Sequence, residues 1–213
     1  MAVFAEQADI VPFLTEQELH FDGLVEAARY GDRERALCSA NDPKGFPLIL
    51  MNAKVARGLR EIFCGPRWEP DETDNQPGIR NPFLKTRVIP CNFDEFAGNP
   101  FADPTNRTEK GSASNKKVRC NATLWIPGLI DPREDDQDNE GEYTTFVLGT
   151  YFDSHIGLRA ELSRPKHFSS GQYKRFETRV MLLDGSEDGS SPIGTKVDRG
   201  GPTEIIDIAI KRK

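Results

Sequence analysis

The sequence predicts an α+β protein that is mainly β, an antiparallel β-barrel or sandwich with two short helices in its N-terminal third. Apolar and polar residues alternate over 156–163 and again over 175–182, as expected for two half-buried antiparallel strands. Other alternating or apolar stretches are 84–91, 117–127, 143–153 and 204–210. Helical spacing of apolar residues occurs only before Pro66.

The two alternating strands are predicted to form a hairpin around a basic and aromatic loop. Such alternation places one face on a core and the other in water. The apolar face would hold Ile156, Leu158, Ala160, Leu162, Phe176, Thr178, Val180 and Leu182. On the polar face, Arg159 and Glu161 would lie opposite charged residues of the second strand, which would help to fix the register. Those residues are Arg175, Glu177 and Arg179.

An apolar N-terminal arm, Val3–Leu14, precedes the first predicted helix. Thr15 and Glu18 have the spacing of a capping box, which predicts a helix that begins at Thr15. The second predicted helix, Ala53–Phe63, has its apolar residues on one face. Asn52 would cap it, and Gly and Pro follow it as they commonly follow a helix. We therefore divide the chain into an arm and helical portion, 1–66, and a β-rich domain, 67–213.

Two long polar stretches interrupt the β-rich domain, at 92–115 and 131–142. The first is long for a structureless loop in a compact domain, so we expect it to be disordered or held by a partner. The second is strongly acidic and resembles the first half of a calcium-binding loop, but Val147 stands where a bidentate glutamate is needed. A solvated acidic loop is therefore the preferred interpretation.

Composition indicates a soluble protein made in the cytoplasm. Nothing at the N-terminus resembles a signal peptide, and no apolar run approaches the length of a spanning helix. The net charge of −6 argues against a protein that coats duplex DNA. The four cysteines are isolated in the sequence, which favours free thiols over a zinc site or disulfides: Cys38, Cys64, Cys91 and Cys120.

No motif of an enzyme was found, so we expect no catalytic residues, no cofactor and no metal. The patterns of a serine nucleophile elbow, a Walker loop and a dinucleotide-binding loop are all absent. Asp153 and His155 would share one face of a strand and could share a metal, but a third ligand cannot be named. A structural role for this histidine is the preferred alternative.

The strongest positive signal is the basic and aromatic loop of the hairpin, which contains no acidic residue. Its candidate binding residues are Arg164, Lys166, His167, Phe168, Tyr173, Lys174, Arg175 and Phe176. A second basic group is Lys116, Lys117 and Arg119, and a third is Arg80, Lys85 and Arg87. Cations beside aromatic rings suit single-stranded nucleic acid. The alternative is a hairpin whose rings pack on the core and whose cations meet an acidic loop of a neighbouring chain.

Two functions follow from these patterns. The preferred one is a non-enzymatic structural or assembly protein that forms a symmetric homo-oligomer or larger complex through its N-terminal arm and long charged loops. A virion- or tail-type building block would fit, so the chain would become part of a viral particle. The alternative is a single-stranded nucleic-acid-binding module of small-barrel, OB-like type that uses loop 164–176.

Overall fold

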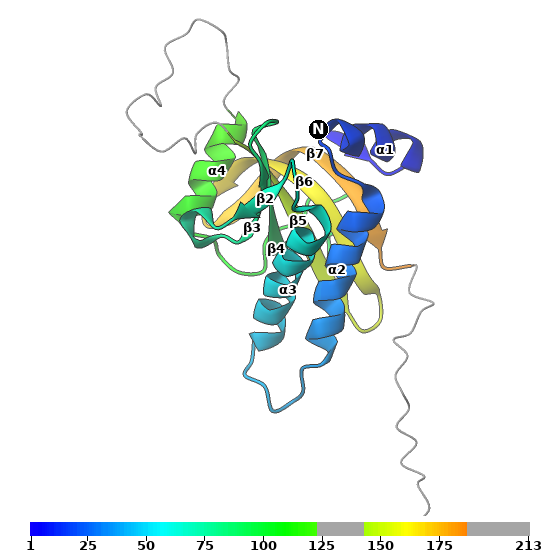
Figure 1. The fold of residues 1–213 in the computed structure, drawn as a ribbon. Coiled ribbons are helices and arrows are strands. Elements are labelled where there is room, and N and C mark those ends of the chain that lie inside the picture. The colour runs from blue at the N-terminus through cyan, green and yellow to red at the C-terminus, as the bar shows by residue number, and fades with distance from the viewer. Residues whose placement is uncertain (123–142, 187–213) are drawn as a thin grey trace, which may run out of the picture.

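The computed structural model describes residues 1–122 and 143–186, and within these residues seven strands form a single open sheet (Figure 1). The strand order is β1-β7-β6-β5-β4-β3-β2. The strands are β1 (Ala2–Phe4), β2 (Glu69–Asp71), β3 (Gly78–Asn81), β4 (Thr86–Asn92), β5 (Thr144–Asp153), β6 (Gly157–Ser169) and β7 (Gln172–Asp184). The helices are α1 (Gln7–Glu16), α2 (Phe21–Ala36), α3 (Phe46–Phe63), the 3-10 turn η1 (Thr73–Asn75) and α4 (Ser112–Ala122).

The predicted antiparallel barrel or sandwich is wrong. The sheet is open and mixed, since β1 pairs with β7 and β4 pairs with β5 in parallel, and the helices are spread through the chain. Part of the error lies in α4, where a strand was predicted from Lys117 onward. Ser114, Lys117, Val118 and Asn121 are the buried residues of this segment, at the spacing of a helix. A short stretch can match both periods, and here the alternation was accidental.

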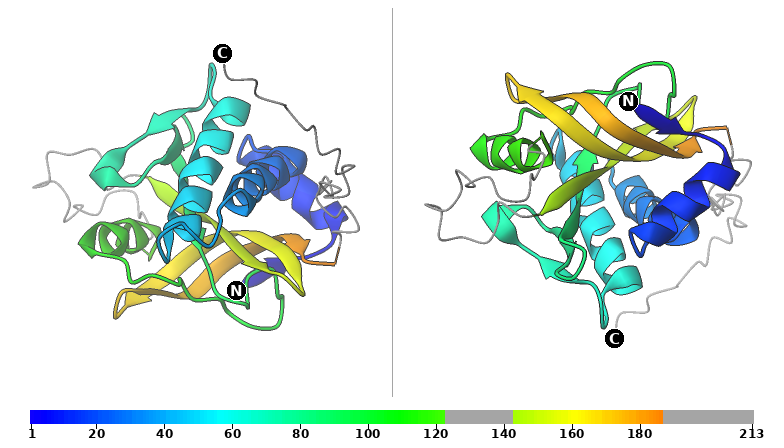
Figure 2. Two further views of the ribbon diagram at one scale, coloured as in Figure 1. Left: turned by 90° about the horizontal axis from the view of Figure 1, so that it is seen from below. Right: turned by 90° about the horizontal axis from the view of Figure 1, so that it is seen from above.

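Helices α1, α2 and α3 cover one face of the sheet and share an apolar core with it (Figure 2). We call this the helical face. Its core therefore draws on both of the portions into which the sequence was divided. The fully buried members include Leu24, Val55, Leu59, Ile79, Val88, Leu148, Ala160, Leu162 and Val180.

The N-terminal helices differ in extent from those predicted. The apolar arm forms β1 and α1, and Thr15 lies near the end of α1, where its hydroxyl donates to the carbonyl of Val11. Helix α2 is capped instead by His20, whose Nδ1 accepts the N–H of Gly23 at 3.0 Å. Helix α3 begins seven residues before the predicted start, directly after Gly45 at φ 87°. The segment before Asn52 thus belongs to the helix.

The predicted hairpin is confirmed as β6 and β7, but its basic loop is mostly strand. Only Ser170 and Gly171 lie between the strands, with φ of 51° and 70°, as in the turns that suit a twisted hairpin. An irregularity between Arg164 and Pro165 shifts the pairing, so that Pro165 lies opposite Phe176. Phe176 consequently faces away from the helical face, although the alternation had placed it there.

The second face of the sheet is covered as well, so the middle part of the hairpin's polar side does not face water. Glu161, Ser163 and Arg179 are buried there. Helix α4 packs on β5 and β6, and residues 93–111 run across this face (Figure 2). A smaller core joins them: Ile89, Cys91, Phe93, Ala97, Val118, Val147, Tyr173 and Phe176. The first long polar stretch is thus held by its own chain.

Some expectations fall outside the described residues, namely the acidic stretch 131–142 and the last predicted strand, 204–210. Among the helices that the structure does describe, none is long and apolar enough to cross a membrane.

Candidate interaction surface

A buried ion pair lies at the centre of the second face. Arg179 donates from Nε to Glu161 Oε1 at 3.0 Å and from Nη2 to Oε2 at 2.6 Å. The pairing is bidentate, which is the strongest geometry for these two groups. The Ser163 hydroxyl also donates to the carboxylate. Both charged side chains are removed from solvent. The ion pair is therefore stabilising only if its remaining hydrogen-bond donors and acceptors also have partners.

The remaining partners come from the backbone of the loop that crosses this face. Arg179 Nη1 donates to the carbonyl of Ala102 at 2.7 Å, and Nη2 donates to that of Asn99 at 3.0 Å. Glu161 Oε2 accepts the N–H of Gly98 at 2.8 Å. Gly98 has a φ of 68°, and a Cβ there would lie 2.3 Å from the carbonyl of Leu183, so only glycine fits. We call this set of contacts the clamp.

Further hydrogen bonds order the loop on either side of the clamp. Asp94 Oδ2 accepts both the N–H of Thr105, at 3.0 Å, and its hydroxyl, at 2.6 Å. Asn99 Oδ1 accepts the N–H of Phe101 at 2.9 Å. Arg159 donates to the carbonyl of Glu95 at 2.5 Å. Residues 94–105, which we call the clamped loop, therefore have a fixed shape without regular secondary structure.

The clamped loop holds two exposed aromatic side chains. Phe101 is 95% exposed, and Phe96 is also exposed. Such rings normally lie in a core, and large exposed apolar groups mark interaction sites. A side chain on an anchored loop can be buried by a partner with little loss of backbone entropy. Neither residue was among the predicted site residues, although both are aromatic residues of the polar stretch 92–115.

The rings predicted to stack on bases face the protein interior. Tyr173 is 2% exposed, and its ring and that of Phe176 lie edge-on to Phe93 at 6.5 Å and 6.0 Å. Phe168 is half-buried against Tyr173. Burial also raises the pKa of the Tyr173 hydroxyl. In this conformation the rings stabilise the second core and are not presented to a nucleic acid.

The predicted basic residues of α4 and of the hairpin lie near one another, but some of them are already engaged by groups of their own chain. Helix α4 packs against β6, so Lys116, Lys117 and Arg119 lie on an element beside the hairpin. Lys117 is buried and donates to Asp74 at 3.0 Å. Arg164 is engaged by Glu177, at 3.4 Å, and by the carbonyl of Asn121.

Four exposed basic side chains, three of them lysine or arginine, remain at the end of the hairpin, and we call them the hairpin cations. They are Lys166, His167, Lys174 and Arg175. His167 and Lys174 are register partners across the two strands. No ion pair to these side chains exists within residues 1–122 and 143–186. The site is thus a small positive patch whose aromatic neighbours are turned inward.

The structure does not place Asp153 and His155 on one strand face. Strand β5 ends at Asp153, whose Oδ1 accepts the backbone N–H of His155 in the turn that follows. Across the described parts of the chain, no three His, Cys, Asp or Glu side chains are grouped as metal ligands would be.

The chain matches no protein family model, no curated protein and no solved structure. Its function is therefore inferred from the geometry of its own residues.

Proposed function

We propose that this chain is a non-enzymatic assembly protein that associates with copies of itself through the clamped loop. The observation that carries the proposal is Phe101, which is 95% exposed on a loop anchored by a buried ion pair. Repeated contacts of this kind suit a virion- or tail-type complex, formed from chains made in the cytoplasm.

Both the Phe101 ring and the clamp that holds its loop would favour association. Burying a phenylalanine side chain stabilises an interface by about 1.5–3 kcal/mol. Aromatic residues at the centre of an interface carry much of its binding energy. Because the clamp fixes the loop beforehand, little conformational entropy is lost when the ring is covered.

In this proposal the clamped loop forms the contact between chains, whereas the sequence had suggested the N-terminal arm for that contact. Strand β1 pairs with β7 of its own chain, with Val3 opposite Arg179, and α1 packs on the helical face. Exchange of the arm between chains would first have to break these contacts, whereas Phe101 is already exposed.

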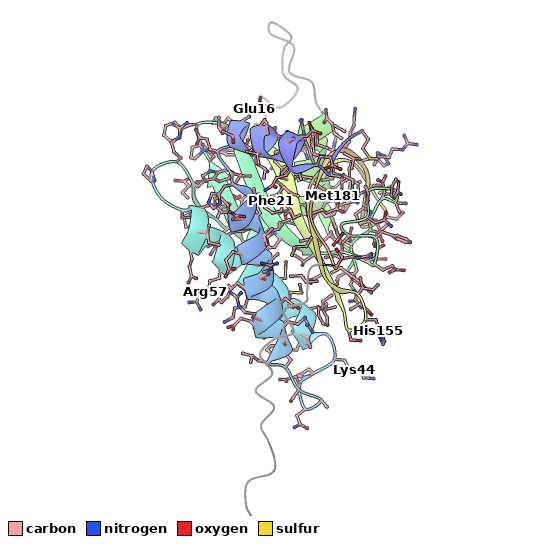
Figure 3. All side chains as sticks on the ribbon, turned by 90° about the vertical axis from the view of Figure 1, so that its right-hand side faces the viewer. Glu16, Phe21, Lys44, Arg57, His155 and Met181 are labelled. Atoms are coloured by element: carbon pink, nitrogen blue, oxygen red, sulfur yellow. The ribbon has the colours of Figure 1, made fainter. Side chains whose placement is uncertain are left out.

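A second group of exposed apolar residues could receive the ring in another copy. Leu37, Phe46 and Ile49 flank the connection between α2 and α3. Lys44 of that connection lies at the same end of the molecule as His155 of the β5–β6 turn (Figure 3). Contact between two different patches is heterologous and generates rings or filaments.

The test is light scattering coupled to size-exclusion chromatography over a range of protein concentrations. The wild-type chain should form assemblies whose mass rises with concentration, and Phe101→Ser should shift the population to the monomer. Phe83→Ser is the matched control, because Phe83 is another exposed phenylalanine, in the β3–β4 turn. A wild-type chain that stays monomeric throughout, or equal behaviour of the two variants, would contradict the proposal.

The hairpin cations support a second candidate, binding of single-stranded nucleic acid. Since the rings are buried, this binding would depend on phosphate contacts and would weaken strongly with salt. The three lysine and arginine side chains among them predict a slope of about −2 in log affinity against log salt concentration. Lys174→Gln with Arg175→Gln should reduce that slope to about a third in fluorescence anisotropy, whereas Lys44→Gln, at an exposed lysine outside the hairpin, should leave it unchanged. Salt-independent binding would rule this candidate out.

A further inference from the structure

A second polar region occupies the other end of the same sheet face. Glu69, Arg80, Arg87 and Thr145 form one row across β2, β3, β4 and β5, each the register partner of the next. Glu69 and Arg80 are 47% and 38% exposed, so the row is open to solvent at the β2 edge. Arg87, further in, is 1% exposed. The exposed fraction of the side chains therefore falls along the row, from the β2 edge to the buried guanidinium of Arg87.

The buried end of the row has polar atoms without partners. Arg87 makes no hydrogen bond from Nε or Nη1, and the nearest carboxylate oxygen, Asp71 Oδ2, lies 3.5 Å from Nη1. That oxygen accepts no hydrogen bond either, nor does Gln76 Oε1. The Thr145 hydroxyl, directly across from Arg87, is also buried and unpartnered. Leaving such a group without a partner is unfavourable, and folded proteins pair nearly all of them.

The surrounding contacts hold these groups in place. Asp71 Oδ1 accepts the N–H and the hydroxyl of Thr73 at 3.1 Å and 2.6 Å. The backbone of Thr145 exchanges two hydrogen bonds with the side chain of Asn121 in α4. Gln76 donates to the Ser114 hydroxyl of the same helix at 2.7 Å. The unpartnered atoms thus belong to residues that are otherwise fixed.

The other buried arginine of this face shows what a structural role requires. Arg179 donates hydrogen bonds from all three of its side-chain nitrogens. Arg87 has the same burial without those acceptors. Arg87 thus lacks the hydrogen bonds by which Arg179 holds its own chain together.

The local charge selects an anion. The ring of Tyr143 lies 4.8 Å from Arg87, 5.3 Å from Lys85 and 6.0 Å from Arg80, all measured to its centroid. Among the described residues, Arg80 pairs with Glu69 and Lys117 with Asp74. The Nε and Nη1 donors of Arg87 lack acceptors, and an anion would supply them.

We infer that Arg87 and Thr145 bind the oxyanion of a small molecule, a carboxylate or a phosphate, beneath α4. This site is separate from the clamped loop and does not depend on the proposed assembly function. Arg87 donates its two unpartnered N–H groups to the oxyanion, and the Thr145 hydroxyl donates to the same group. Asp71 Oδ2 and Gln76 Oε1 are acceptors, so the preferred ligand also carries a hydroxyl or amino group beside its anionic oxygens.

The test is isothermal titration calorimetry on the full chain at constant ionic strength, with phosphate, acetate and glycolate as separate probes. We expect saturable binding of phosphate or of the carboxylates, and the probe that binds identifies the class of anion. Glycolate should bind more tightly than acetate because its hydroxyl can donate to Asp71. Absence of saturable binding in all three titrations would overturn the inference.

Thr145→Val removes only the unpartnered hydroxyl and should weaken binding about tenfold without loss of folded protein, since it deletes one hydrogen bond to a charged group. Thr150→Val is the matched control, a buried threonine of the same strand that alternation places on the helical face. Arg87→Lys keeps the charge but loses the planar fork and should abolish binding. Equal affinities of the two threonine variants would also overturn the inference.

Discussion

The two faces of the sheet are stabilised in different ways. The helical face is an apolar core in which α1, α2 and α3 cover the strands. The second face has a smaller apolar core and, beside it, buried charges: Glu161 with Arg179, and Asp71 with Arg87. Apolar burial is non-directional and tolerates adjustment, whereas a buried ion pair requires partners at fixed positions. The first face therefore supplies stability, and the second determines the shape of a loop and of a polar site.

The clamp should be the most sensitive point of the molecule. Glu161→Leu leaves Arg179 charged, buried and without its carboxylate, and we expect the free energy of unfolding to fall by about 3–5 kcal/mol. Glu161→Leu with Arg179→Met removes both charges and should recover much of that loss. Urea unfolding of the three proteins measures both effects, and a single variant no less stable than the double variant would contradict this role of the pair.

Cys91 reports whether the clamped loop has moved. Its thiol is buried beside Phe93 and Ala97, and this burial raises its pKa to about 11. At pH 8 only about one thiol in a thousand is then ionised, so Cys91 should resist iodoacetamide in the wild-type protein. In Glu161→Leu it should be modified under native conditions, as followed by mass spectrometry.

A large cavity on the helical face should lower stability without moving the loop. Leu148 is fully buried in that core, and Leu148→Ala should cost about 2–5 kcal/mol. Because the clamp is untouched, Cys91 should stay as protected from iodoacetamide as in the wild type at urea concentrations well below the transition. Modification of Cys91 in this variant as fast as in Glu161→Leu would show that the two faces are not separable.

The sequence predicts the strands well and their arrangement poorly. Alternation correctly located β4, β5 and the hairpin. It could not give strand direction, which depends on the connections: β4 and β5 are parallel, and α4 lies in the chain between them. Parallel neighbours need a long crossover, usually with a helix. Because the segment of α4 was predicted to be a strand, no helix was left to connect β4 and β5 as parallel neighbours. The predicted fold was therefore antiparallel.

The candidate sites were less accessible to sequence reasoning than the strands. The cations of the hairpin could be read from a contiguous segment. The clamp joins residues near 100 to Glu161 and Arg179, and the oxyanion site joins Asp71, Arg87 and Thr145. Such contacts depend on which strands are neighbours, so they could not be derived before the sheet order was known. Burial of Tyr173 likewise depends on the register shift that turns the end of the hairpin.

The smallest loss of stability is expected when a polar contact on the helical face is removed. His20 caps α2 by accepting the N–H of Gly23, and its ring packs on Phe63 with centroids 4.7 Å apart. His20→Ala removes both contacts and should cost about 1 kcal/mol, a typical value for loss of an N-cap. His20→Asn restores an acceptor at the cap position and should recover most of the capping part. If urea unfolding shows no difference among the three proteins, the cap contributes nothing, and the helical side depends on apolar burial alone. A loss as large as that of Glu161→Leu would instead mean that polar contacts matter equally on the two faces.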